Sequence, residues 1–348
     1  MARILSNQRA LWLPLSAIAI LTLLASKAHA QLDTQYDPDW ARHFRVGALA
    51  GFNIKADFKF TGKIKVAGNG DGIYDDGYVI SNPNVTADDY TSNWGYDDAS
   101  QFDGDHTLTM HRTDSFSPTS SKSVQEDNEL AHIGLDLVYG GNIWYWKHLR
   151  IGWDLGFGLL PIVITDNQSF DATLSRSFDT FDTEPGVPFF PPPGYRGNPN
   201  SDGRAIHSNP SSSGVDPTTT VETVSGSRTL DLMLYSLRLG PSVFWDVNQH
   251  IGLSLGAGPA VALVSGKYEW NEQIGDNTRN KGHFDVSDVL YGGYIEATMT
   301  YHAVRNGDFY ISAQYMPLGT ANFSHGGREA TLDMKGSVLL AGGINWPF

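Results

Sequence analysis

Six charged residues occupy the same phase of a two-residue repeat in which large apolar side chains alternate with small or polar ones. A β-strand would point all six to one side. An unpaired buried charge is costly, so three cations and three anions enclosed together should form ion pairs. The same charges would also suit a small gated pore or a proton-linked site. The six residues of this predicted charge network, in which arginines pair with acids, are Arg45, Asp136, Arg150, Asp154, Arg238 and Glu296.

A second candidate for chemistry is the stretch GNGDGIYDDGYV at positions 68–79, which is rich in Asp and Gly. A calcium loop needs oxygen ligands at alternating positions. Asn69, Asp71, Asp75 and Asp76 supply oxygens, but Ile73 interrupts the repeat and no Glu follows at the required offset. We therefore expect a solvated hairpin here, and we expect no metal or cofactor elsewhere in the chain.

Histidines near Ser and Asp raise the question of a hydrolase or an acyltransferase. Such an enzyme needs a nucleophile, a base and an orienting acid at matched positions. The spacing of the histidines in polar connections does not single out a triad, so we predict that the protein is not an enzyme. These histidines are His106, His111, His207, His283 and His325.

The elements that must position these residues are strands, because the two-residue alternation recurs in eight segments. Each is long enough for a tilted membrane crossing of about 9–11 residues. In the fourth segment the apolar phase changes between Leu232 and Leu239, which predicts a β-bulge near Leu234–Tyr235. The expected strands are 46–60, 131–140, 149–160, 228–245, 250–268, 286–303, 308–323 and 331–348.

The connections between these strands alternate in length. The short ones are 141–148, 246–249 and 304–307, whereas 61–128, 167–227, 269–284 and 324–330 are mostly longer and polar. Within them, 184–220 is rich in Pro, Ser and Gly and is expected to be a mobile loop. A soluble sandwich or lipocalin-like barrel would point the bulky residues inward, but a small barrel has room inside only for modest side chains. The pattern predicts an all-β fold: a closed antiparallel up-and-down transmembrane β-barrel of about eight strands with long extracellular loops.

The beginning of the chain resembles an export signal. Arg3 and Arg9 precede an apolar stretch over 11–26, and Ala28-His29-Ala30 is a small-x-small cleavage site. Residues 1–30 are therefore predicted to be a signal peptide cleaved after Ala30. The alternative is a retained transmembrane anchor, but the apolar stretch is short for a membrane span. The segment holds three basic residues and no acidic one, so its loss lowers the net charge from −14 to −17. That charge argues against nucleic-acid binding, and the absence of cysteine excludes disulfides.

The end of the chain, SVLLAGGINWPF, is an alternating strand that finishes on aromatic residues. With Trp144, Trp146 and Trp245, its Trp346 and Phe348 are predicted to form an aromatic girdle at the periplasmic interface. Together with the signal peptide, the eight strands and the unequal loops, this ending resembles small OmpA/OmpX-like outer-membrane β-barrels. The stretches YDDGYV and NWGY are also similar to those of uncharacterised bacterial outer-membrane barrels.

The resemblance implies that Ile344, Trp346 and Phe348 form a C-terminal insertion signal for the barrel-insertion machinery, although Pro347 departs from the usual pattern. It also implies residence in the bacterial outer membrane, with lipid as a partner. The acidic loops are candidates for binding an extracellular ligand. Two functions follow: a structural or surface-interaction role, or, as the alternative, a narrow channel or transporter for ions or small solutes.

Overall fold

The structure is a computed structural model, and it describes the chain from Ala41 onward with short gaps. The predicted signal peptide and its cleavage site lie outside the described residues. No helix in the described part is long and apolar enough to span a membrane. The described residues are 41–67, 70–81, 90–102, 106–119, 124–127, 131–146, 148–183, 191–199, 205–275, 278–304 and 307–348.

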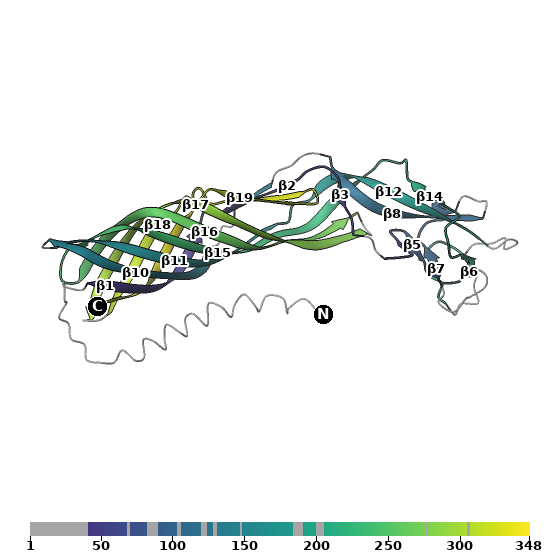
Figure 1. Ribbon diagram of the computed structural model, residues 1–348. Coiled ribbons are helices and arrows are strands. Elements are labelled where there is room, and N and C mark those ends of the chain that lie inside the picture. Colours follow the sequence, from purple (N-terminus) through teal and green to yellow (C-terminus); the bar gives the residue numbers. More distant parts are fainter. Residues whose placement is uncertain are drawn as a thin grey trace.

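Eight strands form a closed antiparallel ring, which confirms the predicted fold class (Figure 1). Each strand pairs with the next along the ring, β11 pairs with β15, and the last strand pairs with the first. The short turns and the C-terminus lie at one end, the short-turn end, and the other connections extend from the opposite end, the head end. The eight strands are β1 (Arg42–Phe52), β10 (His132–Trp146), β11 (Leu149–Asp166), β15 (Thr220–Asp246), β16 (Ile251–Ile274), β17 (Thr278–Val304), β18 (Gly307–Tyr315) and β21 (Val338–Pro347).

The large apolar residues of the ring point outward near the short-turn end. Leu239, Leu255 and Ile311 are 51%, 62% and 59% exposed, whereas the alternate positions Arg238 and Ser312 are buried. Small residues inside and bulky ones outside are what an eight-stranded ring can accommodate, because its bore is narrow. The outer surface of this half is therefore apolar, as the sequence predicted.

Toward the head end the ring opens into two facing sheets. The strands β11, β15, β16 and β17 continue, while β1 breaks at Asn53, whose φ is +56° and whose side-chain amide donates to the Gly336 carbonyl at 2.8 Å. A separate four-stranded sheet, in the order β19-β20-β2-β9, then faces the long strands. Its members are β2 (Lys55–Phe60), β9 (Val124–Asp127), β19 (Thr320–His325) and β20 (Arg328–Asp333).

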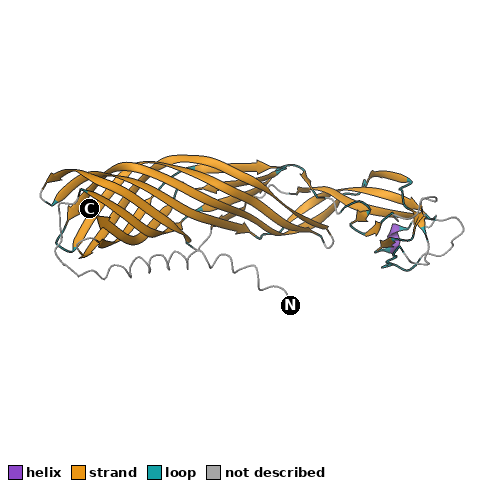
Figure 2. Ribbon diagram, turned by 60° about the horizontal axis from the view of Figure 1, so that its bottom comes forward, coloured by secondary structure: helices purple, strands orange, loops and turns teal. Residues whose placement is uncertain are grey.

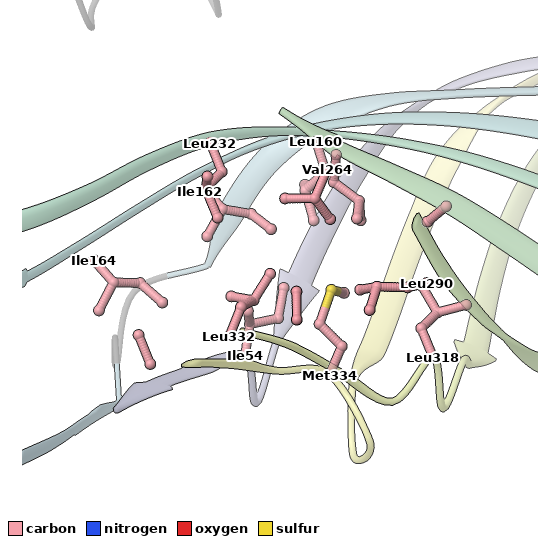
Figure 3. Packing of buried hydrophobic residues seen from close by; sticks show 14 of the residues in the cluster. Ile54, Leu160, Ile162, Ile164, Leu232, Val264, Leu290, Leu318, Leu332 and Met334 are labelled. Atoms are coloured by element: carbon pink, nitrogen blue, oxygen red, sulfur yellow. The ribbon is translucent and has the colours of Figure 1, made fainter. Parts of the chain in front are cut away.

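A hydrophobic core fills the space between these two sheets (Figure 3). Ile54, just before β2, Leu332 from the four-stranded sheet, and Ile162, Leu232 and Val264 from the long strands are each no more than 2% exposed. Burying a side chain of this size contributes roughly 1.5–3 kcal/mol. This core, called here the apolar plug, therefore holds the two sheets together and occupies the interior on the head side.

The predicted β-bulge near Leu234–Tyr235 is wrong. The pairing of β15 with β11 runs in one register from Trp245–Leu149 to Arg228–Asp166. The even-numbered residues of β15 point inward along the whole strand, so the phase of the strand is constant. What changes along the strand is the kind of interior that these residues face. Arg238 faces a polar interior, whereas Leu232 faces the apolar plug.

Two further expectations need correction. The expected strand 46–60 does not keep one phase: it slips at Asn53, so Ile54, Ala56 and Phe58 are buried, while Lys55 and Asp57 are only half-buried on the other side. The expected loop 269–284 is mostly strand, because β16 extends to Ile274 and β17 begins at Thr278.

The segments predicted as long outer loops contain further strands that continue the barrel sheet beyond the ring as a lobe, the head (Figure 2). Its core contains Trp94, Tyr96, Leu108, Met110 and Phe181. Strand β15 begins at Thr220, inside the expected loop 167–227. The other elements of these segments are β3 (Ile64–Lys65), β4 (Ile73–Tyr74), β5 (Gly77–Val79), β6 (Tyr90–Thr91), β7 (Trp94–Tyr96), a 3-10 turn (Ala99–Gln101), β8 (Thr107–Pro118), β12 (Phe170–Asp182), β13 (Ile206–His207) and β14 (Ser212–Val215).

Candidate functional site

Five of the six charged residues predicted to form a network meet inside the barrel on the short-turn side. The Arg45 guanidinium lies 3.1 Å from Glu296 Oε1 and 3.2 Å from Asp154 Oδ2. The Arg238 guanidinium lies 2.9 Å from Asp136 Oδ1 and 3.4 Å from Glu296 Oε2. Glu296 therefore bridges both arginines, and all five side chains are buried. We call these five residues the central network.

Glycines on the neighbouring strands make room for the central network. A Cβ atom on Gly156 would overlap the Arg238 guanidinium, and one on Gly140 would overlap the Asp154 carboxylate. The glycine-rich inward face of β10 and β11 thus follows from the volume of the charged side chains that it must accommodate. His43, which the sequence analysis did not single out, adds an imidazole 3.2 Å from Asp154 Oδ1.

Arg150 belongs to a different group from the one predicted. Its guanidinium lies 2.5 Å from Asp246 Oδ1, at the short-turn end of β15. Nearby, His302 Nδ1 lies 3.1 Å from Asp308 Oδ2 and Nε2 lies 4.0 Å from Asp246. The sequence did not identify Asp246 because this residue lies at the end of its strand, where the alternation no longer shows which side a residue faces. Asp308 lies near the beginning of its strand and was missed for the same reason.

A second buried network covers the head side of the apolar plug. Arg228 Nε lies 2.8 Å from Asp166 Oδ2, and Arg228 Nη1 lies 3.7 Å from Glu272 Oε1. Arg328 lies 2.5 Å from the other oxygen of Glu272 and 4.3 Å from the centre of the Trp270 ring. Arg228 has the same phase as Arg238 on β15, so the sequence pattern could have identified it as an inward-facing charge. Glu272 could not be found because its segment was expected to be a loop.

In the head, the YDDG turn closes the edge of β8. Asp75 Oδ2 accepts a hydrogen bond from the Thr113 amide at 2.7 Å, and Asp76 Oδ1 accepts one from the His111 amide at 2.9 Å. Asp76 Oδ2 lies 2.7 Å from His111 Nδ1, and this hydrogen bond raises the pKa of the His111 ring. Two of the four candidate calcium ligands thus bind backbone amides.

The other two candidate calcium ligands are Asp71, which is exposed, and Asn69, which lies outside the described residues. The described part of the chain holds no group of three or more His, Asp or Glu side chains arranged to bind a metal ion. The geometry of the turn is therefore that of a structural cap on a strand edge.

The histidines considered for catalysis are dispersed. His111 pairs with Asp76, His207 packs on Tyr90 with ring centres 4.2 Å apart, and His325 packs near Phe284. His106 has a φ of +74° at the start of β8, and His283 is exposed on β17. Within the described residues no hydroxyl nucleophile is hydrogen-bonded to the His111 ring. That the protein is not an enzyme stays a prediction.

The last strand closes the ring despite Pro347. Pro347 lies opposite His43, and beyond it the Phe348 amide donates to the Arg42 carbonyl at 2.8 Å while the Arg42 amide donates back at 2.9 Å. The missing N–H of Pro347 therefore does not end the pairing with β1. Trp346 stacks on Phe44, with ring centres 6.5 Å apart.

The predicted girdle residues gather at the short-turn end. Trp144, Trp146, Trp245 and Phe348 are 52–62% exposed there. Trp144 and Trp146 follow a register shift between Asn142 and Trp144 in the pairing of β10 with β11. Ile344, Trp346 and Phe348 share the outward phase of β21. Their role as an insertion signal stays a prediction.

Comparison with known proteins gives matches among solved structures. No family model and no curated protein matches the chain. Among solved structures, it is similar to Ail, the attachment invasion locus protein of Yersinia pestis, in complex with the heparin analogue sucrose octasulfate, at 8% identity over 86% of this chain and 98% of that one, with a TM-score of 0.27.

Two other solved structures are similar at the same level. The outer membrane protease OmpT from Escherichia coli matches at 9% identity over 90% of this chain and 98% of that one, with a TM-score of 0.32. A Pseudomonas aeruginosa FadL homologue matches at 10% identity over 88% of this chain and 90% of that one, with a TM-score of 0.20. These values carry no argument about the activity of this chain.

Proposed function

We propose that this chain is an outer-membrane β-barrel that anchors an extracellular head for surface interaction. The first support is the height of the apolar belt. On β16 the outward residues are apolar from Ile251 to Leu263 and become polar by Lys267. Thirteen residues at about 3.3 Å each, tilted by about 45°, span roughly 30 Å, the thickness of a bilayer hydrocarbon core.

The observation that carries the anchoring role is the apolar plug. A route for ions through the barrel would have to pass the central network and then the core around Leu232, Val264 and Leu332, whose side chains are at most 2% exposed. Residues packed this closely leave no continuous space for hydrated ions, and an apolar interior offers them no compensation for lost water. The plug therefore supports a sealed anchor over the channel alternative.

The head supplies the surface for interaction. It lies at the end of the molecule opposite the C-terminus (Figure 1), so a barrel with its short turns in the periplasm would hold it outside the cell. Its aromatic core gives it a packed structure of its own, and Asp71 and Asp98 are exposed on it, whereas Asp97 pairs with Arg196. A cationic ligand or surface is the partner chemistry that these acids favour.

Epitope insertion tests this assignment. One tag is placed between Asn209 and Pro210, exposed residues near β13 and β14, and a matched tag is placed between Asn248 and Gln249 in the β15–β16 turn. We expect antibody to bind the first tag on intact cells and the second only after the outer membrane is permeabilised. Accessibility in the reverse order, or of neither tag in a membrane-inserted protein, would refute the proposed orientation.

A further inference from the structure

A groove of about 810 Å³ crosses the outer surface of the barrel on the short-turn side, and its walls are two rows of outward side chains. Strand register defines both rows. In the first, Leu149 lies opposite Trp245, and the row continues to Ile311 on β18. The second row runs through paired residues from Val243 on β15 to Leu340 on β21.

The groove is open because two alanines meet in the second row. Ala297 on β17 lies directly opposite Ala313 on β18. Larger neighbours protrude around them: Leu255, which lies opposite Ala297 on β16, is 62% exposed, and Met299, in the first row, is 43% exposed. The lining is almost wholly apolar, so a ligand of matching chemistry would be a hydrocarbon.

The path of the groove fits one leaflet of a bilayer. It begins at Leu149, the first residue of β11 after the short turn, and rises to Leu340. Five steps between strands at about 4.8 Å each give a length of roughly 24 Å. With strands tilted by about 45°, that length covers a depth of roughly 17 Å, close to half of the about 30 Å hydrocarbon core.

We propose that this groove binds one acyl chain of a phospholipid from the periplasmic leaflet. This inference rests on the proposed membrane location, in which the hydrocarbon of the lipids surrounds the apolar belt along the whole groove. The starting point at the short-turn end selects the periplasmic leaflet. Leu255 and Met299 project beyond the alanines, so a slender chain reaches the groove floor, whereas the wall of a second barrel would rest on these two residues.

The test fills the groove and leaves the rest of the belt unchanged. The variant is Ala297→Leu with Ala313→Leu, and the matched control is Ala48→Leu with Ala257→Leu, two outward alanines that do not line the groove. Each protein is reconstituted into vesicles of phosphatidylethanolamine and phosphatidylglycerol and extracted in mild detergent. Native mass spectrometry then counts the lipids retained on each barrel, and heat-modifiable migration on a gel verifies that each barrel is folded.

We expect the natural chain and the control to retain one phospholipid, and the filled variant to retain roughly tenfold less, which corresponds to the loss of about two buried methylenes. If the double variant does not fold, Ala313→Val is the second variant, with a smaller loss in the same direction. Equal retention by filled and control proteins would overturn the inference. So would a dimer that disappears on filling, or retention of lipopolysaccharide when the protein is extracted from cells. A chain that does not enter vesicles would instead contradict the proposed membrane location.

Discussion

At the scale of single residues, Arg238 has two buried ion-pair partners inside the barrel. It pairs with Asp136 and shares Glu296 with Arg45, so its removal would leave two buried carboxylates with reduced compensation. Removing one partner of a buried ion pair typically destabilises a protein by about 3–5 kcal/mol, because the remaining charge is uncompensated.

We therefore expect Arg238→Ala to lower the unfolding free energy by about 3–5 kcal/mol in urea titrations of the lipid-inserted protein. Arg279→Ala serves as the control, because Arg279 is exposed on β17 and contacts only Gln273 among the described residues. A change no larger than that of the control would mean that water solvates the interior charges.

His111 makes the head sensitive to pH. The hydrogen bond to Asp76 raises the pKa of the ring above its unfolded value of about 6.5. Its contribution to stability is therefore complete below that value and is lost as the pH rises through the raised folded pKa. We expect amide hydrogen exchange at β8 to be slower, after correction for intrinsic rates, at pH 5.5 than at pH 8.5. His111→Gln should abolish this difference; an unchanged pH dependence in that variant would assign it to other groups.

At the scale of elements, the structure assigns different surroundings to residues of one strand that look alike in sequence. Leu232 on β15 is 2% exposed in the apolar plug, and Leu239 on the same strand is 51% exposed on the outer surface. Leu232→Ala should cost about 2–5 kcal/mol because it leaves a cavity. Leu239→Ala leaves none and should cost clearly less in the same urea titration. Equal effects would argue that the plug is not packed.

The last strand allows a separate test of assembly. Deleting Phe348 removes one exposed aromatic at the short-turn end, for which the loss to a folded barrel is about 1.5–3 kcal/mol, and the two backbone hydrogen bonds with Arg42, each of which contributes about 1 kcal/mol. If Phe348 also belongs to an insertion signal, its deletion should reduce the outer-membrane yield in cells far more than it reduces folding into synthetic lipid. Normal yield in cells would show that this residue does not direct insertion.

The strands of the ring could be predicted from sequence because their two-residue periodicity is sustained. The shared phase of the six charged residues also predicted that they meet inside the barrel, and five of them do. The break at Asn53 could not be predicted, since it depends on a contact with Gly336 far along the chain. The change of interior at Leu234 was misinterpreted as a bulge because apolar residues face inward on one side of it and outward on the other.

The head was the least predictable part, for a physical reason. Several of its strands have only two to four residues, such as β4 and β14, which is too short for a periodicity to be recognised. Their positions depend on contacts between distant segments, for example Asp76 with His111 and Tyr74 with Asp179.

At the scale of the whole molecule, the interior is layered along the barrel axis. The central network lies toward the short-turn end, the apolar plug follows, and the network around Arg228 and Glu272 lies beyond it, below the head. The two outer layers close the interior with paired charges whose arginines lie against aromatic rings, and the layer between them closes it with packed apolar side chains. We therefore infer a sealed barrel that carries an extracellular head.

Conductance across a planar bilayer tests that claim most directly. Protein from one preparation is divided: heat-modifiable migration establishes the fraction folded in lipid, and the remainder is added to the bilayer under an applied voltage in potassium chloride. We expect a bilayer current indistinguishable from that of lipid alone, because ions cannot cross the apolar plug. Reproducible unitary current steps from the folded protein, which disappear when it is omitted, would contradict a sealed anchor and favour the narrow channel.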